Sequence, residues 1–154
     1  MLKRTSKQLS MFSSLEDMLS HQHPLFQLSN KINWECFEKA FSPLYCSTNG
    51  RPAHPIRLMC GLLILKYLRN VSDEMVVFQW SENAYYQYFC GGLEFMPKQP
   101  CDASELVHFR NRIGEEGMEL ILAEIIRVNT VHDDEDHFDT AFIDSTVQEK
   151  NITY

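Results

Sequence analysis

The sequence predicts a mainly helical fold that is followed by a short β segment. Helix-capping residues precede apolar stretches of helical periodicity at three places, near Ser13, Ser72 and Asp102. The apolar run from residue 58 to 65, bounded by charged residues, has the composition of a buried helix. Residues 138–147, in contrast, are rich in the β-branched and aromatic residues that favour a strand.

Composition places the chain among globular proteins, with 154 residues, 44% hydrophobic and 23% charged. The 14 basic and 21 acidic residues give a net charge of −7, so nonspecific nucleic-acid binding over the whole surface is disfavoured. Residues 1–70 carry nine basic and four acidic residues, a net of +5, whereas residues 71–154 carry five and 17, a net of −12. This asymmetry indicates either an anion-binding half or two differently solvated surfaces.

The cysteine pattern and the absence of a leader predict a cytoplasmic protein without a membrane span. The five cysteines show no C-x-x-C spacing, and the polar start of the chain does not resemble a signal peptide. We therefore expect reduced thiols. The longest apolar run, residues 58–65, is too short to cross a bilayer.

The first helices are short. Ser13 and Glu16 form a capping box that predicts a helix ending near residue 20, before Pro24, which we interpret as a stop. Asn33 is placed to cap a second helix that runs to Phe41, with aromatic residues at i, i+3 and i+7 along one side. That aromatic stripe is most simply part of the core.

The helix expected over residues 56–69 has almost no polar face, so it should be the central and most buried element. A loop rich in turn formers, residues 47–55, precedes it. Its ends are basic. The cations flanking it are Arg51, Arg57, Lys66 and Arg69.

Ser72 opens a third long helix, which we expect to run without interruption to Phe89. It carries two apolar stripes, so it either lies between two layers or presents one stripe to a partner. The second stripe consists of Phe78, Tyr85 and Phe89.

Asp102 and Glu105 predict the start of a short helix that Gly114 closes, and a last helix follows over residues 115–129. The polar side of the short helix carries His108, Arg110, Asn111 and Arg112. The acidic run at 133–136 is interpreted as a solvated linker in preference to a metal cluster, because consecutive carboxylates point in different directions.

These patterns divide the chain into a polar lead-in (1–12), a helical domain (13–130), an acidic linker (131–137) and a β segment (138–154). The β segment is too short to supply the partner strands of a sheet. We therefore expect it to be the truncated beginning of a further domain.

Three motifs in the same order resemble the N-terminal part of bacterial insertion-sequence transposases of the DDE type. The first is G-R-P-A-H-P-I-R-L-M-C-G-L-L-I-L-K-Y-L-R-N-V-S-D-E, residues 50–74. The second is F-R-N-R-I-G, residues 109–114, and the third is the closing F-I-D-S-T-V-Q-E-K-N-I-T-Y. The resemblance covers roughly residues 12–154.

The resemblance implies that the β segment begins an RNase H-like α/β core and that Asp144 is the first catalytic carboxylate. Three such carboxylates hold two Mg²⁺ ions in this family. The nearest other acids, Asp139 and Glu149, lie about 16 Å away along an extended strand. Because one carboxylate does not hold a Mg²⁺ pair, we expect no cofactor for this chain alone and interpret it as a truncated, frameshifted or split transposase that is catalytically incomplete.

For the helical domain, the resemblance implies binding to the terminal inverted repeats of a mobile element, or formation of a homodimer. In a helix-turn-helix-like layout the short helix would enter the major groove. The expected DNA contacts are His108, Arg110, Asn111 and Arg112, with Arg51 and Arg57 nearby. Two alternatives stay open: a solvated helix face in which Glu105 pairs with Arg112 or His108, and a dimerisation module that makes no DNA contact.

Overall fold

The computed structural model describes residues 14–45 and 53–133, with side chains described up to residue 130. This part of the chain contains helices and no strand, which confirms the mainly helical prediction. The β segment and Asp144 lie outside the described residues. The elements are α1 (Leu15–Met18), α2 (Pro24–Lys31), α3 (Trp34–Phe41), η1 (Ser42–Leu44), α4 (Ile56–Arg69), α5 (Asp73–Glu82), α6 (Ala84–Phe89) and α7 (Ala103–Asp133).

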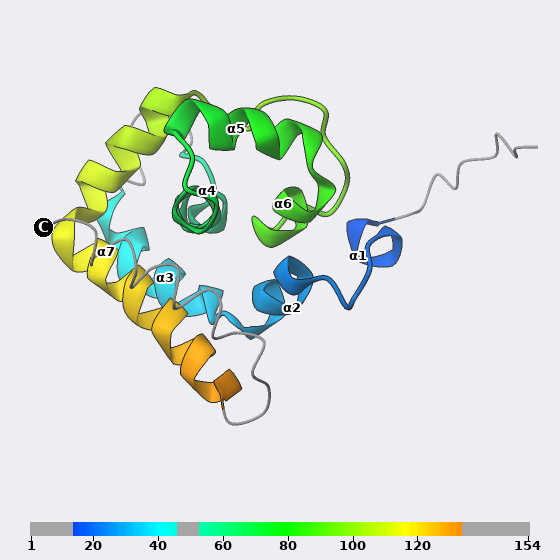
Figure 1. Cartoon of the computed structure of the whole chain (residues 1–154). Coiled ribbons are helices and arrows are strands. Elements are labelled where there is room, and N and C mark those ends of the chain that lie inside the picture. The colour runs from blue at the N-terminus through cyan, green and yellow to red at the C-terminus, as the bar shows by residue number, and fades with distance from the viewer. Residues whose placement is uncertain (1–13, 46–52, 134–154) are drawn as a thin grey trace, which may run out of the picture.

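Helix α4 is the centre of the domain, as its sequence predicted. Figure 1 views it end-on, with α5 and α6 above and to the right, α2 and α3 below, and α7 along the left. It contacts α3, α5, α6 and α7. Leu62, Leu63 and Leu65 are fully buried, because neighbours on all sides leave no place for a polar face.

The N-terminal region differs from the prediction in two ways. The cap of α1 is Ser14, whose Oγ accepts a hydrogen bond from the Asp17 N–H at 3.3 Å, whereas Ser13 lies outside the described residues. Helix α2 was not predicted, although Pro24 at its first position is a typical helix start. The Nδ1 of His23 caps it by accepting from the Leu25 N–H at 3.1 Å.

Helix α3 begins and ends where the sequence predicted. Asn33 takes the cap position, and its backbone N–H donates to Oε1 of Glu124 on α7 at 3.1 Å. The aromatic stripe is core: Phe37 and Phe41 are buried, and the Phe41 ring meets that of Phe109 edge-on. The start of α3 is thereby fixed to α7.

The prediction of one uninterrupted helix from residue 72 to 89 is wrong. Asn83 adopts an extended conformation between α5 and α6, and its Oδ1 accepts from the N–H groups of Tyr85 and Tyr86. A side chain that caps a new helix competes with continuation of the old one. The chain therefore turns at Asn83, and α6 packs against α2.

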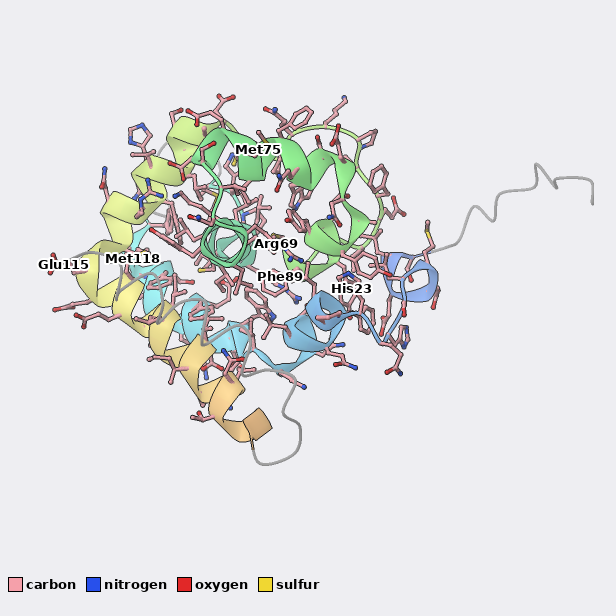
Figure 2. All side chains as sticks on the ribbon, in the orientation of Figure 1. His23, Arg69, Met75, Phe89, Glu115 and Met118 are labelled. Carbon is pink, nitrogen blue, oxygen red and sulfur yellow. The ribbon has the colours of Figure 1, made fainter. Side chains whose placement is uncertain are left out.

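The turn at Asn83 divides the second apolar stripe, which the sequence left open as a partner-binding face. Phe89 is fully buried, as its inward position in Figure 2 illustrates. The Tyr85 hydroxyl accepts from the Ser20 N–H at 3.0 Å, and its ring stacks on His23. Of the three stripe residues only Phe78 is exposed.

Gly114 divides α7, as predicted, but by a kink within one long element. Its φ of 66° and ψ of −169° are non-helical, and the second half of α7 continues to Asp133 instead of ending at 129. At the start of α7, the Asp102 N–H donates to Oε2 of Glu105 at 2.9 Å, the capping-box contact expected there.

The described cysteines Cys36, Cys60, Cys90 and Cys101 are free thiols, and Cys46 lies outside the described residues. Burial raises the pKa of Cys60 and of Cys90, which keeps both as unreactive thiols. No helix in the described ranges has the length and hydrophobicity needed to cross a membrane.

Candidate nucleic-acid interface

The first half of α7 has one buried and one exposed side. With 3.6 residues per turn, His108, Asn111 and Arg112 share one side, and all three are exposed. Residues on the other side enter the core. They are Leu106, Phe109 and Ile113. The structure thus brings together three of the predicted DNA contacts, and we call these three residues the polar face of α7.

A cleft of about 210 Å³ borders the polar face, between α7, Tyr45 after η1 and the segment just before α4. Tyr45 and His54 line it from those segments, and His108 and Arg112 line it from α7. The Arg112 guanidinium lies over the Tyr45 ring, 4.5 Å from its centroid. This stacking limits the freedom of Arg112.

Glu105 organises the inner end of the cleft. Its Oε2 lies 3.1 Å from Nε2 of His54 and also accepts the Asp102 N–H. The sequence had suggested Arg112 or His108 as the partner of Glu105, whereas the structure adds His54. This contact ties the segment before α4 to the first turn of α7.

Arg110 lies away from the polar face. Its two terminal nitrogens donate to the two carboxylate oxygens of Asp73 on α5, each at 3.1 Å. The hydrogen bonds from Arg110 lower the pKa of Asp73, and those same bonds raise the pKa of Arg110. Arg110 therefore fixes α7 to α5 from the side opposite the cleft.

Arg57 lies within the domain, half-buried beneath α2 and α3. Its guanidinium stacks on Trp34 at 4.6 Å, and Nη2 donates to Oγ of Ser29 at 2.9 Å. Burial lowers its pKa. The turn after α6 passes so close that a Cβ on Gly91 would lie 2.9 Å from Cδ of Arg57. Arg51, the other predicted cation of this region, lies outside the described residues.

The expected helix-turn-helix-like layout is not the arrangement around α7. Residues 90–102 connect α6 to α7, which is much longer than the turn of three to four residues in that motif. The first half of α7 is instead held from two sides, by the Arg110–Asp73 pair and by the His54–Glu105 contact.

Within the described ranges, no group of three His, Cys, Asp or Glu side chains could hold a metal ion. Asp144, the predicted first carboxylate, lies outside those ranges, so its role stays a prediction.

Sequence reasoning did not single out Tyr45 and His54 as site residues. His54 lies in the turn-rich segment before α4, and Tyr45 follows η1. Neither belongs to a periodic pattern, and both reach the cleft through packing between elements distant in sequence. The one signal available was an aromatic and a basic residue at either end of a stretch of sequence that is rich in turn formers and precedes a buried helix.

Comparison with known proteins defines the class as that of transposase domains. A family model described as "Transposase domain (DUF772)" matches residues 13–112, from the residue before the α1 cap to the last residue of the polar face. Because this match covers most of the chain, the protein belongs to the DUF772 transposase-domain family.

A relative from Rhizobium meliloti, described as an uncharacterized protein, ORF8 in the nfe locus, is 37% identical over 142 residues. The similarity covers 91% of this chain and 68% of the relative. No solved structure matches the chain significantly.

Proposed function

We propose that this domain binds DNA in transposition, with the polar face of α7 entering the major groove. The observation that carries the proposal is the exposed set His108, Asn111 and Arg112 on one side of a helix that lies inside the matched transposase domain. The resemblance to DDE transposases suggests the terminal inverted repeats of a mobile element as the target.

The chemistry of the polar face suits base and phosphate recognition. Asn111 offers an amide that can pair with the donor and acceptor edge of adenine, and Arg112 offers a planar guanidinium for guanine or phosphate. Val107 is exposed beside them and can contact a thymine methyl group. The helical turns from Ala103 to Gly114 extend about 16 Å, which suits a groove about 12 Å wide.

The two anchors of α7 make this face rigid. Asp73 of α5 holds Arg110, and His54 contacts Glu105 in the first turn. A recognition helix that is fixed before binding loses less conformational entropy when DNA arrives. Because the chain as a whole is negatively charged, favourable interaction with DNA phosphates is restricted to the polar face of α7. We therefore expect the affinity for the target sequence to exceed the affinity for other DNA clearly.

The test is a fluorescence-anisotropy titration of the chain with a labelled duplex from the ends of the mobile element, at several salt concentrations. Arg112→Ala should weaken binding about five- to tenfold. It should also reduce by about one the slope of the logarithm of the binding constant against the logarithm of the salt concentration. Lys39→Ala removes one exposed cation on α3 and should leave affinity unchanged.

Equal affinity for the element's ends and for a scrambled duplex would argue against sequence recognition. If Arg112→Ala binds the duplex as tightly as the unaltered chain does, the polar face of α7 is not the DNA-binding surface.

We also propose that Asp144 supplies the first of the three carboxylates that hold Mg²⁺ in a DDE transposase. The support is the resemblance of the closing motif, F-I-D-S-T-V-Q-E-K-N-I-T-Y. Bound Mg²⁺ ions activate the attacking oxygen and stabilise the leaving one during phosphodiester cleavage. The role of Asp144 is to position one such ion.

A further inference from the structure

The buried residues in the first half of α7 define which direction of this helix points outward. This half runs along the outer edge of the domain (Figure 1). Each residue advances about 100° around the helix axis, so Leu106, Phe109 and Ile113, which are buried, cluster around one direction. The opposite direction points away from the core. Asn111 lies within about 10° of this outward direction, whereas Arg112 lies about 90° from it, on the side of the cleft.

Tyr45 holds Arg112 at this flank of the helix. The Tyr45 backbone N–H donates to the Ser42 carbonyl at 3.1 Å, and the Tyr45 side chain packs against the core. The ring is therefore a fixed platform, and the Arg112 guanidinium lies over it, 4.5 Å from its centroid. Because a guanidinium that is stacked on a ring has less orientational freedom, the charge of Arg112 stays beside the helix and not in front of it.

The inner part of the cleft does not suit an anion. Met59 and Phe109, which are buried, line it together with the carboxylate of Glu105, which would repel a phosphate. Arg112 lies two helical turns from Glu105, about 10 Å further along α7. A phosphate is therefore favoured at the Arg112 end of the cleft. His108, one turn before Arg112 and exposed, can donate an N–H to the same phosphate.

We infer that Arg112 contacts a backbone phosphate of the DNA, that Tyr45 positions Arg112 for this contact, and that Asn111 reads a base edge. A helix about 10–12 Å in diameter fills a major groove about 12 Å wide. Its outward side then faces the base edges, and its flanks face the phosphates along the groove walls. This inference rests on the proposed DNA binding and deepens it, because it assigns a different part of the DNA to each of these side chains. Tyr45 is a positioning residue that acts through Arg112.

The first experiment uses duplexes from the element's ends in which one phosphate at a time is replaced by an uncharged methylphosphonate. At one position this replacement should raise the dissociation constant of the unaltered chain about five- to tenfold. The same replacement should have no effect on Arg112→Ala, because that variant has already lost the contact. Arg112→Ala should stay sensitive to replacements at the other contacted phosphates.

The second experiment measures the ratio of the affinities for the element-end duplex and for a scrambled duplex. Arg112→Ala should leave this ratio unchanged, because a phosphate contact carries no sequence information. Asn111→Ala should lower the ratio about fivefold or more, because it removes a contact to a base.

The third experiment tests Tyr45 as the positioning residue. Tyr45→Leu removes the ring and should weaken DNA binding about two- to fivefold. It should cause no further loss in Arg112→Ala, and Tyr45→Phe, which keeps the ring, should recover most of the affinity. Tyr67→Leu is the matched control, because the Lys66 ammonium lies 5.0 Å from the Tyr67 ring centroid, outside the residues of the cleft. It should leave the affinity unchanged. Circular dichroism confirms that each variant is folded.

The outcomes separate this inference from the proposed function. If Arg112→Ala remains sensitive to every replacement that affects the unaltered chain, the phosphate contact is overturned although DNA binding stands. Additive losses in Tyr45→Leu and Arg112→Ala would overturn the positioning role of Tyr45, and an unchanged affinity ratio in Asn111→Ala would overturn base reading by Asn111. Failure of the unaltered chain to bind the unmodified duplex would contradict the proposed function, and this inference with it.

Discussion

Arg110 and Arg112 show how spacing on a helix decides the role of a residue. Two residues correspond to about 200° around the helix axis, so these side chains point to nearly opposite sides. Arg110 accordingly pairs with Asp73, while Arg112 stacks on Tyr45 beside the cleft. The sequence grouped both as DNA contacts because both are cations in one polar stretch. The helical period alone would have separated them.

The Asp73–Arg110 pair predicts a pH-dependent contribution to stability. Arg110 holds the folded-state pKa of Asp73 below its ordinary value of 3.8. The contribution is therefore fully present above that value and is lost as the pH falls through the lower folded-state pKa. Asp73→Asn should reduce the free energy of unfolding by about 1–2 kcal/mol at neutral pH and by less in acid.

Urea unfolding of both proteins at pH 7 and near pH 3 measures this difference. Glu74→Gln is the control, since Glu74 lies in the same first turn of α5 and is exposed. A loss of stability in Glu74→Gln equal to that in Asp73→Asn would assign the effect to the helix dipole and not to the ion pair.

At the scale of elements, local signals predicted most helices, and two local signals that were misinterpreted explain the misses. The apolar composition of α4 and the caps at Ser72 and Asp102 were sufficient to place three helices. Helix α2 was missed because Pro24 was interpreted as a stop instead of a first helical residue. The break at Asn83 was missed because the apolar pattern continues across it.

The kink at Gly114 predicts a specific sensitivity of α7. A φ of 66° with a ψ of −169° is a conformation that essentially only glycine adopts, and a Cβ there would meet nothing within 4 Å. Gly114→Ala should therefore reduce the free energy of unfolding by about 1–3 kcal/mol through backbone strain alone. Thermal or urea unfolding measures it.

Glu116→Ala, at an exposed position just beyond the kink, is the matched control and should be nearly neutral. If Gly114→Ala is as stable as the unaltered chain, α7 straightens without loss of stability. The kink between its two halves would then need a cause other than the glycine.

At the scale of the molecule, the sequence predicted the mainly helical fold class. It also carried the resemblance to transposases, and the family match confirms the transposase part of that resemblance. The candidate site was predictable only in part. Its helix was found by capping signals, whereas the cleft depends on Tyr45 and His54, which packing brings to α7. The exposure of Leu122 in the second half of α7 could not be foreseen either, because the apolar pattern of that helix does not say which of its apolar residues the domain covers.

The 154-residue chain tested on its own should neither cleave nor join DNA. In its proposed role Asp144 would supply one negative charge for two Mg²⁺ ions, which is too few to hold them against water. The assay incubates the purified chain with labelled DNA from the element's ends and Mg²⁺ or Mn²⁺. Cleavage that an Asp144→Ala variant lacks would contradict this prediction and would imply ligands shared between copies.

The central claim is that the polar face of α7 contacts DNA, and amide chemical shifts of ¹⁵N-labelled protein during titration with the element-end duplex test it most directly. The largest shifts should fall on residues 104–112 and on Ala53 and His54, with little change along α3 or around Phe78. Shifts concentrated elsewhere, or no shifts at concentrations where the anisotropy titration reports binding, would contradict the claim.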